Sequence, residues 1–326
     1  MGTVKAITVA HAQVGSSGVW CHAGCDIVVN VLSADLPFAS HYIQVRGSRM
    51  HYIDEGEGRP FLLLHGNPTW SYLWRNVIPH LEPLGRVIAV DLIGMGRSDK
   101  PAIGYRYDDH YAYLEGFIEA LGLEGVTLVL HDWGSVLGFR YAMEHEARIR
   151  AIAFMEANVR PRYSWEEFEG PAGELFRQFR TPGIGWNLLI EQNMMIERVL
   201  PGAVLRPLTE TEMDHYREPY LLPEHRLPLW RWPNELPIAG EPADVFAIVD
   251  TYSTWLQRSP LPKLLLHADP GAIITEPIRR WCEDTFKNLT SVSVGPGIHF
   301  IQEDNPDGIG QAIAAWFFEC LGSYPD

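Results

Sequence analysis

Length, composition and charge already exclude several classes of protein. The chain has 326 residues, with 26 lysines and arginines against 41 aspartates and glutamates, so its formal net charge is −15. This charge argues against nucleic acid and anionic membrane surfaces as partners. No run of about 18 apolar residues is present, so no membrane-spanning helix is predicted. The length suffices for one substantial α/β core with a smaller accessory domain.

Residues 1–36 are predicted to be an N-terminal extension that is poorly ordered and lies outside the main fold. They contain Cys21, His22 and Cys25, a grouping that could suggest a metal site. No second Cys/His pair with ligand spacing follows, so we expect neither a metal nor a cofactor. We find no secretory signal in this segment, and the few cysteines suit a reducing compartment, so we predict a cytoplasmic location.

Strand and helix patterns alternate regularly after the extension. Residues 42–45 and 49–53 flank an Arg-Gly-Ser turn, which is typical of a hairpin. Three strand-helix alternations then begin at Phe61, Arg86 and Val126. This pattern predicts the α/β class, with a mostly parallel, doubly wound sheet.

The amino-acid composition and the helical pattern change between residues 158 and 240. This stretch is rich in proline and tryptophan and contains only short helical pieces, at 165–168, 173–180, 187–199 and 209–220. We interpret residues 158–240 as an inserted helical cap domain. Residues 37–157 and 241–326 then form the main domain.

The first candidate site residue is Asn67. The apolar run 61–64 is typical of a buried strand and ends in His-Gly-Asn-Pro-Thr-Trp. A backbone N–H in this loop could contribute to an oxyanion hole, and the side chain of Asn67 could point into the same pocket. An Asn-Pro pair is otherwise an ordinary turn signal.

The most informative stretch is 126–135, Val-Thr-Leu-Val-Leu-His-Asp-Trp-Gly-Ser. It predicts a buried strand, a sharp turn at Asp132 and a helix, like the elbow that carries serine in Gly-x-Ser-x-Gly hydrolases. Gly134 supplies one small residue of that motif, whereas Leu130 stands in place of the other. N–H groups at the helix start should keep the Asp132 carboxylate ionised. The alternative role for Asp132 is that of a helix N-cap.

An aspartate at this elbow changes the chemistry. Attack by a serine on a saturated carbon would form an ether, which water does not cleave at a useful rate. Attack by Asp132 forms an ester, which an activated water can hydrolyse through a tetrahedral intermediate. We therefore expect displacement at a saturated carbon followed by ester hydrolysis.

An acid and a base should follow the nucleophile along the chain. His299 lies on a glycine-rich loop after the strand pattern 291–294, where the base is expected. Two carboxylates are candidates for the acid: Glu156 ends the strand pattern 150–155, and Asp269 follows the strand pattern 263–267. Both carboxylates remain candidates from the residues alone, although Asp269 lies beside Pro and Gly, where a turn role suffices.

The cap is expected to provide an apolar substrate pocket. Aromatic side chains recur at helical spacing in its first helix, and a methionine follows in the next. The same apolar stripe could instead only pack against the core. The pocket residues that we predict are Phe168, Phe176, Phe179, Met195 and Ile273.

These motifs closely resemble those of the haloalkane dehalogenases, in the subfamily whose acid follows the sixth strand. The resemblance runs from about Pro37 to Phe318 and rests on the segments 65–69, 131–134, 154–157 and 299–304. It implies Asp132 as nucleophile, His299 as the base and Glu156 as the acid. It also implies that Asn67 and Trp133 hold the departing halide, although Trp133 could serve core packing alone.

Two other functions remain open from the sequence. An epoxide hydrolase can share the His-Asp-Trp-Gly motif, but it needs cap tyrosines, for which Tyr163, Tyr216 and Tyr220 are available. A ligand-binding protein without turnover would not need His299. The expected partners are a halogenated aliphatic substrate, water and halide, and the expected state is a monomer or weak homo-oligomer.

Overall fold

The computed structural model describes residues 6–7, 32–168 and 170–322. Its strands form a nine-stranded sheet in the order β1-β9-β8-β7-β6-β4-β5-β3-β2. Most of the predicted extension, with Cys21, His22 and Cys25, lies outside the described residues. Among the residues that are described, no helix combines the length and apolar character needed to cross a bilayer.

The sheet is mostly parallel, as predicted. Strands β2 and β3 form the expected antiparallel hairpin, β3 pairs antiparallel with β5, and the remaining pairs are parallel. The strands are β1 Ala6–Ile7, β2 His41–Val45, β3 Ser48–Glu55, β4 Pro60–Leu64, β5 Arg86–Val90, β6 Val126–Asp132, β7 Ile149–Ala157, β8 Lys263–Pro270 and β9 Leu289–Gly297.

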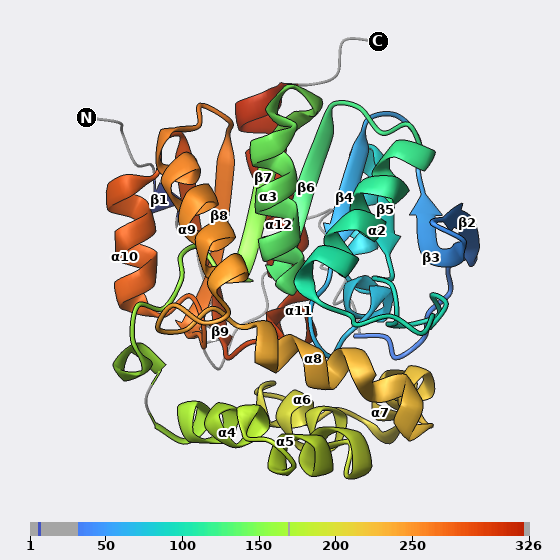
Figure 1. The fold of residues 1–326 in the computed structure, drawn as a ribbon. Coiled ribbons are helices and arrows are strands. Elements are labelled where there is room, and N and C mark those ends of the chain that lie inside the picture. The colour runs from blue at the N-terminus through green and yellow to red at the C-terminus, as the bar shows by residue number, and fades with distance from the viewer. Residues whose placement is uncertain (1–5, 8–31, 169, 323–326) are drawn as a thin grey trace, which may run out of the picture.

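Helices cover both faces of the sheet (Figure 1). Alternation along β4 explains the two layers, because Leu62 and Leu64 enter one buried apolar cluster and Phe61 and Leu63 enter the other. The helices and turns of this part are η1 Ser71–Trp74, α1 Ile78–Leu81, η2 Glu82–Leu84, α2 Tyr107–Ala120, α3 Trp133–Glu144, η3 Glu146–Arg148, α9 Ala243–Arg258, α10 Glu276–Thr285, α11 Ile301–Asp304 and α12 Pro306–Leu321.

Packing between β6 and α3 accommodates the unusual Leu130. A Cβ atom at Gly138 would lie 2.4 Å from Cδ2 of Leu130. The leucine on the strand therefore depends on a glycine facing it from the helix.

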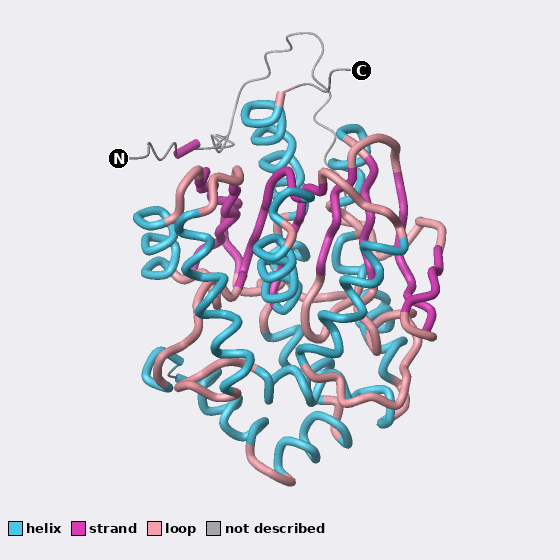
Figure 2. Tube along the Cα trace, turned by 45° about the horizontal axis from the view of Figure 1, so that its top comes forward, coloured by secondary structure: helices cyan, strands magenta, loops and turns pink. Residues whose placement is uncertain are grey.

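The cap segment, residues 158–240, forms a helical layer beyond one end of the sheet (Figures 1 and 2). The predicted helical pieces are present, but α8 is additional, because its prolines made it look like a loop. Pro228 lies in the first turn, where the missing N–H of proline costs no helical hydrogen bond, whereas Pro233 lies inside the helix. The elements are η4 Trp165–Phe168, α4 Gly170–Arg180, α5 Ile184–Trp186, η5 Asn187–Glu191, η6 Met195–Val199, α6 Leu200–Gly202, α7 Glu210–Arg217, η7 Glu218–Tyr220, η8 Pro223–Arg226 and α8 Leu227–Glu235.

The two segments that connect the main fold to the cap segment pair with each other. Arg162 and Ile238 form an isolated parallel bridge. The N–H of Arg162 donates to the carbonyl of Pro237 at 3.2 Å, and the carbonyl of Arg162 accepts from the N–H of Ala239 at 2.9 Å. The backbone is therefore fixed where the cap segment begins and ends.

A buried ion network joins the cap segment to the main fold. Arg75 donates to Glu303 at 2.6 Å and to Glu212 of α7 at 2.8 Å, and all three side chains are almost fully buried. Arg206 also pairs with Glu212 and Glu303, each at 2.6 Å. Two arginines thus balance two glutamates, and one of these glutamates, Glu303, is close in sequence to His299.

Candidate active site

A cavity of about 410 Å³ lies between the main fold and the cap segment. Asp132, His299, Asn67 and Trp133 contribute to its wall from the main fold, and mostly apolar side chains contribute from the cap segment. Its volume is within the range of small-molecule sites, about 300–1,000 Å³.

Asp132 occupies a sharp elbow at the junction of β6 and α3. Its backbone angles, φ 49° and ψ −123°, are rare for a residue other than glycine. The turn is tight because Gly66 and Gly134 pack against it: a Cβ atom at Gly66 would lie 2.1 Å from Oδ1 of Asp132, and one at Gly134 would lie 2.2 Å from the carbonyl oxygen of Leu64. The elbow predicted from the sequence is therefore present.

Two backbone N–H groups face the Asp132 carboxylate. Asn67 donates to Oδ1 at 2.9 Å, and the N–H of Trp133 also donates to the carboxylate. Burial nevertheless raises the pKa of Asp132 above its ordinary value, while His299 and the two N–H groups act in the opposite direction. The sequence analysis considered the N–H donors, which favour the ionised carboxylate, but not burial, which disfavours it.

His299 stands between two carboxylates. Its Nε2 lies 3.7 Å from Oδ2 of Asp132, and its Nδ1 lies 3.2 Å from Oε2 of Glu156. Burial alone would lower the pKa of His299. The hydrogen bond with Glu156 and the charges of Asp132 and Glu156 outweigh burial, so the pKa lies above its ordinary value.

Glu156 is held by the loop that follows β8. Its Oε2 accepts the N–H groups of Ala272 at 3.0 Å and Ile273 at 2.7 Å, and its Oε1 accepts that of Ile274 at 3.2 Å. Asp269, the other candidate acid, is exposed at the end of β8, and it is Glu156 that contacts His299. The loop beside Asp269 thus supplies backbone donors to Glu156.

The backbone of His299 is fixed from both sides. Its N–H, like that of Phe300, donates to the carbonyl of Ala203 in the cap segment, at 3.1 and 3.2 Å. Its carbonyl lies 2.9 Å from Nε2 of His131, so His131 must carry its proton on Nε2. Burial lowers the pKa of His131 well below its ordinary value, and this histidine is neutral.

The predicted halide-binding residues, Asn67 and Trp133, both line the cavity beside Asp132. The indole of Trp133 stacks on Trp232, with ring centroids 4.3 Å apart, and Trp232 stacks in turn on His110 at 4.1 Å. Sequence reasoning did not identify Trp232, because its contact with Trp133 joins α8 to α3 across 99 positions of the sequence.

Four of the five predicted pocket residues line the cavity: Phe168, Phe176, Met195 and Ile273. The prediction for Phe179 was wrong, because its ring is fully buried and packs behind the wall against Phe176, at 5.6 Å between centroids. A periodic apolar stripe does not show which turn of a helix faces a cavity and which faces the core.

Two arginines that were not predicted also line the cavity. Arg162 lies on the segment between β7 and η4, and Arg198 lies on η6. Charged residues in a cap are usually solvated, so no signal in the sequence separates these two from the other arginines of the segment.

The three cap tyrosines lie away from the cavity wall. Tyr163 is 56% exposed and donates to Asp250 at 2.9 Å. Tyr216 is fully buried and contacts Glu303 in the ion network, and Tyr220 is fully buried. The described residues that line the cavity include no tyrosine.

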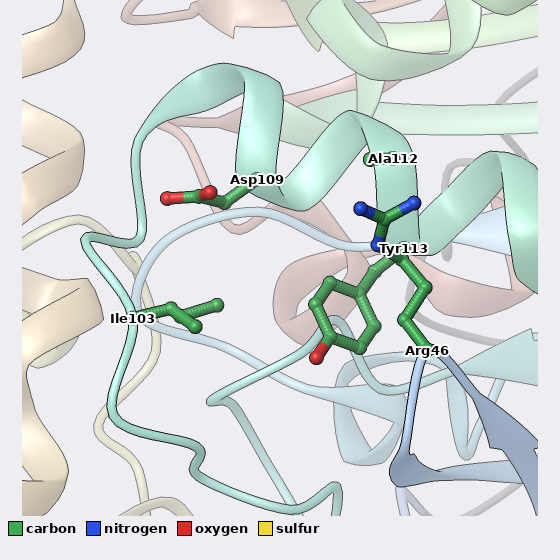
Figure 3. Close-up of a pocket in the computed structure, with 5 residues that line it drawn as sticks. All are labelled: Arg46, Ile103, Asp109, Ala112 and Tyr113. Carbon is green, nitrogen blue, oxygen red and sulfur yellow. The ribbon is translucent and has the colours of Figure 1, made fainter.

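A second hollow, of about 460 Å³, lies at α2 beside the β2–β3 turn (Figure 3). Its polar groups serve the local structure, since Asp109 accepts the N–H of Arg106 at 2.9 Å and the hydroxyl of Tyr113 lies 3.1 Å from that of Ser48. This hollow has no nucleophile beside a base.

A cluster of Glu115, Glu144 and His145 has spacing that a metal ion could use. Glu144 is already paired with Arg140 at 2.9 Å, and His145 with Glu115 at 3.2 Å. The cluster lies at the end of α3 opposite Asp132, so it takes no part in the site.

The chain is similar to proteins of known activity. A family described as alpha/beta hydrolase fold matches residues 59–306. A haloalkane dehalogenase of Sphingobium indicum is 51% identical over 281 residues, covering 84% of this chain and 94% of that protein. One of Mesorhizobium japonicum is 46% identical, covering 86% and 91%. The crystal structure of haloalkane dehalogenase DbeA from Bradyrhizobium elkani USDA94 has a TM-score of 0.85 and 41% identity, covering 88% of this chain and all of that one.

Proposed function

The chain belongs to the haloalkane dehalogenases, hydrolases that act on carbon–halogen bonds, and from this premise we propose that Asp132, His299 and Glu156 carry the reaction. The observation that supports these roles is the line of contacts from Asp132 through His299 to Glu156, at 3.7 and 3.2 Å. The halogenated substrate and water are the reactants, and the alcohol and the halide are the products.

In the first half-reaction, a carboxylate oxygen of Asp132 attacks the carbon that bears the halogen. The new C–O bond forms as the C–halogen bond breaks, and the halide leaves with the bonding electrons. The side-chain N–H groups of Asn67 and Trp133 stabilise the charge that develops on the halogen. The product is an alkyl ester of Asp132.

In the second half-reaction, Nε2 of His299 takes a proton from water, whose oxygen attacks the carbonyl carbon of the ester. The N–H groups of Asn67 and Trp133 face the carboxylate and stabilise the negative oxygen of the intermediate. Glu156 orients the imidazole and stabilises its positive charge. Collapse of the intermediate releases the alcohol, which takes the proton from His299. The carboxylic acid that remains at Asp132 loses the second proton of the water to solvent, which restores the carboxylate.

The proposal extends to the organisation of the chain. Residues 158–240 act as a cap domain that closes the cavity, since they supply most of its apolar wall. The location is cytoplasmic, in keeping with the buried, unbridged thiol of Cys282, and the protein is a monomer or weak homo-oligomer. Cell fractionation and size-exclusion chromatography test these two points.

The experiment that tests the function is halide release from 1-bromobutane, measured beside diol formation from styrene oxide. We expect bromide and butanol from the first compound and no diol from the second, because no tyrosine that could protonate an epoxide oxygen lines the cavity in the part of the chain that the structure describes. Asp132→Ala should release no bromide while keeping the native circular dichroism spectrum. Diol as the main product, or bromide release by Asp132→Ala, would contradict the proposal.

A further inference from the structure

Arg162 places a positive charge in the wall of the catalytic cavity. Its side chain lines the same cavity as Asp132 and His299. Its backbone is held by the bridge to Ile238, where the cap segment begins and ends. The fold therefore fixes the backbone position from which this side chain reaches the cavity wall.

The guanidinium of Arg162 lacks a carboxylate partner among the described residues. Its Nη1 donates to the neutral amide oxygen of Asn158 at 3.2 Å, and the ring of Phe168 lies against it, 4.7 Å from its central carbon. Neighbouring Arg160, in contrast, is paired with Glu167 at 2.6 Å. Burial lowers the pKa of Arg162 to about 10, so the group stays charged at neutral pH.

A partly buried guanidinium in an apolar wall is costly unless an anion balances it. Asp132 and Glu167 both interact with Arg162 through charge, but Asp132 becomes a neutral ester during turnover and Glu167 is paired with Arg160. Glu156 is engaged by His299 and three backbone N–H groups. Among the described residues, no carboxylate without another partner is therefore left to neutralise Arg162 throughout the reaction, and a bound ligand can supply one.

The charges around the cavity support the same conclusion. Among the described residues, its charged lining consists of Asp132, His299, Arg162 and the exposed Arg198, so two arginines oppose one carboxylate there. The chain as a whole carries a net charge of −15. The cavity thus attracts anions on a protein whose net charge repels them.

We propose that this enzyme acts on haloalkanes that carry a carboxylate at the end opposite the halogen, and that Arg162 binds this carboxylate. The inference rests on the proposed function and specifies its substrate class. With the reacting carbon at Asp132, the alkyl chain lies along the apolar wall and its carboxylate meets the guanidinium, whose planar N–H groups suit bidentate binding. Arg162 also offsets the repulsion between the substrate carboxylate and Asp132.

The test compares 6-bromohexanoate with its uncharged methyl ester at neutral pH and low salt. The readout is the ratio of kcat/KM for the acid to that for the ester, measured within each variant, so that folding losses cancel. We expect wild-type enzyme to prefer the acid, and Arg162→Leu to lower the ratio by about 10- to 100-fold, as charged hydrogen bonds are lost. Arg162→Lys should lie between them, because lysine keeps the charge without the planar fork.

Arg160→Leu is the matched control. It removes the same charge from the same loop, but Arg160 does not line the catalytic cavity, so the ratio should remain near that of the wild type. An equal ratio in wild type and Arg162→Leu, or an equal fall in Arg160→Leu, would overturn the inference. Bromide release from the ester but not from the acid would overturn it while leaving the dehalogenase function in place. No bromide from either compound would overturn both.

Discussion

Nδ1 of His299 lies 3.2 Å from Oε2 of Glu156, a residue 143 positions earlier in the chain. The imidazole is the only side chain that contacts this carboxylate among the described residues, and backbone N–H groups take up the remaining acceptor sites. Such a carboxylate is fully desolvated and fixed in direction. It therefore orients the imidazole and favours its protonated form.

His299→Phe should release one equivalent of halide and then stall as a covalent alkyl-enzyme. An ionised carboxylate needs no base to attack carbon, whereas water does. Intact-mass spectrometry after mixing with 1-bromobutane should show an adduct of the alkyl mass. Steady turnover, or no adduct even with a reactive bromide, would exclude the role proposed for His299.

Glu156→Gln and Asp269→Asn separate the two candidate acids. Loss of the group that orients His299 should reduce turnover by about 10²- to 10⁴-fold and let the ester accumulate. Asp269→Asn should stay within about tenfold of wild type on the same scale, because Asp269 is exposed and apart from the imidazole. Steady-state halide release and mass spectrometry distinguish them, and the reverse ranking would move the acid to Asp269.

The pH profile of turnover should reflect the raised pKa of His299. The base must be neutral when it deprotonates water, so kcat should fall as the pH drops. Asp132 is then an uncharged ester, so the hydrogen bond and charge of Glu156 are what still raise the pKa of His299 and the midpoint of the profile. In Glu156→Gln, burial still lowers the pKa of His299 while the contributions of Glu156 that raise it are gone, so the midpoint of the residual activity should move to lower pH. An unchanged midpoint would mean that another group limits the rate.

Asn67→Ala and Trp133→Phe should each slow the alkylation step and weaken bromide inhibition. Each removes a side-chain N–H, and losing one preorganised donor costs about 10²- to 10³-fold. Trp133→Phe keeps the backbone N–H at Asp132, so ester hydrolysis should suffer less than alkylation. Stopped-flow kinetics with 1,2-dibromoethane resolves the two steps. Equal effects on both would show that these side chains only shape the cavity.

Arg75→Met should destabilise the protein by about 3–5 kcal/mol, because it leaves buried carboxylates without their partner. Arg280→Met is the control: its pair with Glu276 is exposed at the surface, and its loss should cost at most about 1 kcal/mol. Denaturant unfolding of the two variants measures both values. Similar losses would mean that the Arg75 network is solvated in solution.

Features encoded by local sequence could be predicted. The strands and the elbow at Asp132 depend on short apolar runs and on the requirement for small residues such as Gly134, and both are visible over about ten positions. The positions of His299 and Glu156 at strand ends follow from the same periodicity. These patterns sufficed for the α/β class and for placing the candidate residues at strand ends, whereas the choice of Glu156 over Asp269 rested on the resemblance to the haloalkane dehalogenases.

Features that depend on packing between distant segments could not be predicted. Phe179 and Phe176 belong to the same helical stripe, yet only Phe176 reaches the cavity. The sequence does not distinguish Arg162 from other loop arginines. Its place in the cavity wall depends on the bridge to Ile238, which is distant in sequence. The raised pKa of Asp132 is a further case, because it results from burial, which the short elbow motif does not reveal.

The carbonyl of Ala203 accepts the N–H groups of both His299 and Phe300, so the cap segment and the loop of the base share a backbone connection. A rigid-body opening of the cap would either break these bonds or displace the imidazole from Asp132. We therefore expect substrate to enter, and alcohol and halide to leave, through local rearrangements of side chains at the cavity mouth, which keep both hydrogen bonds intact. Bulky substrates will then be limited by the rate of passage, however reactive their carbon–halogen bond.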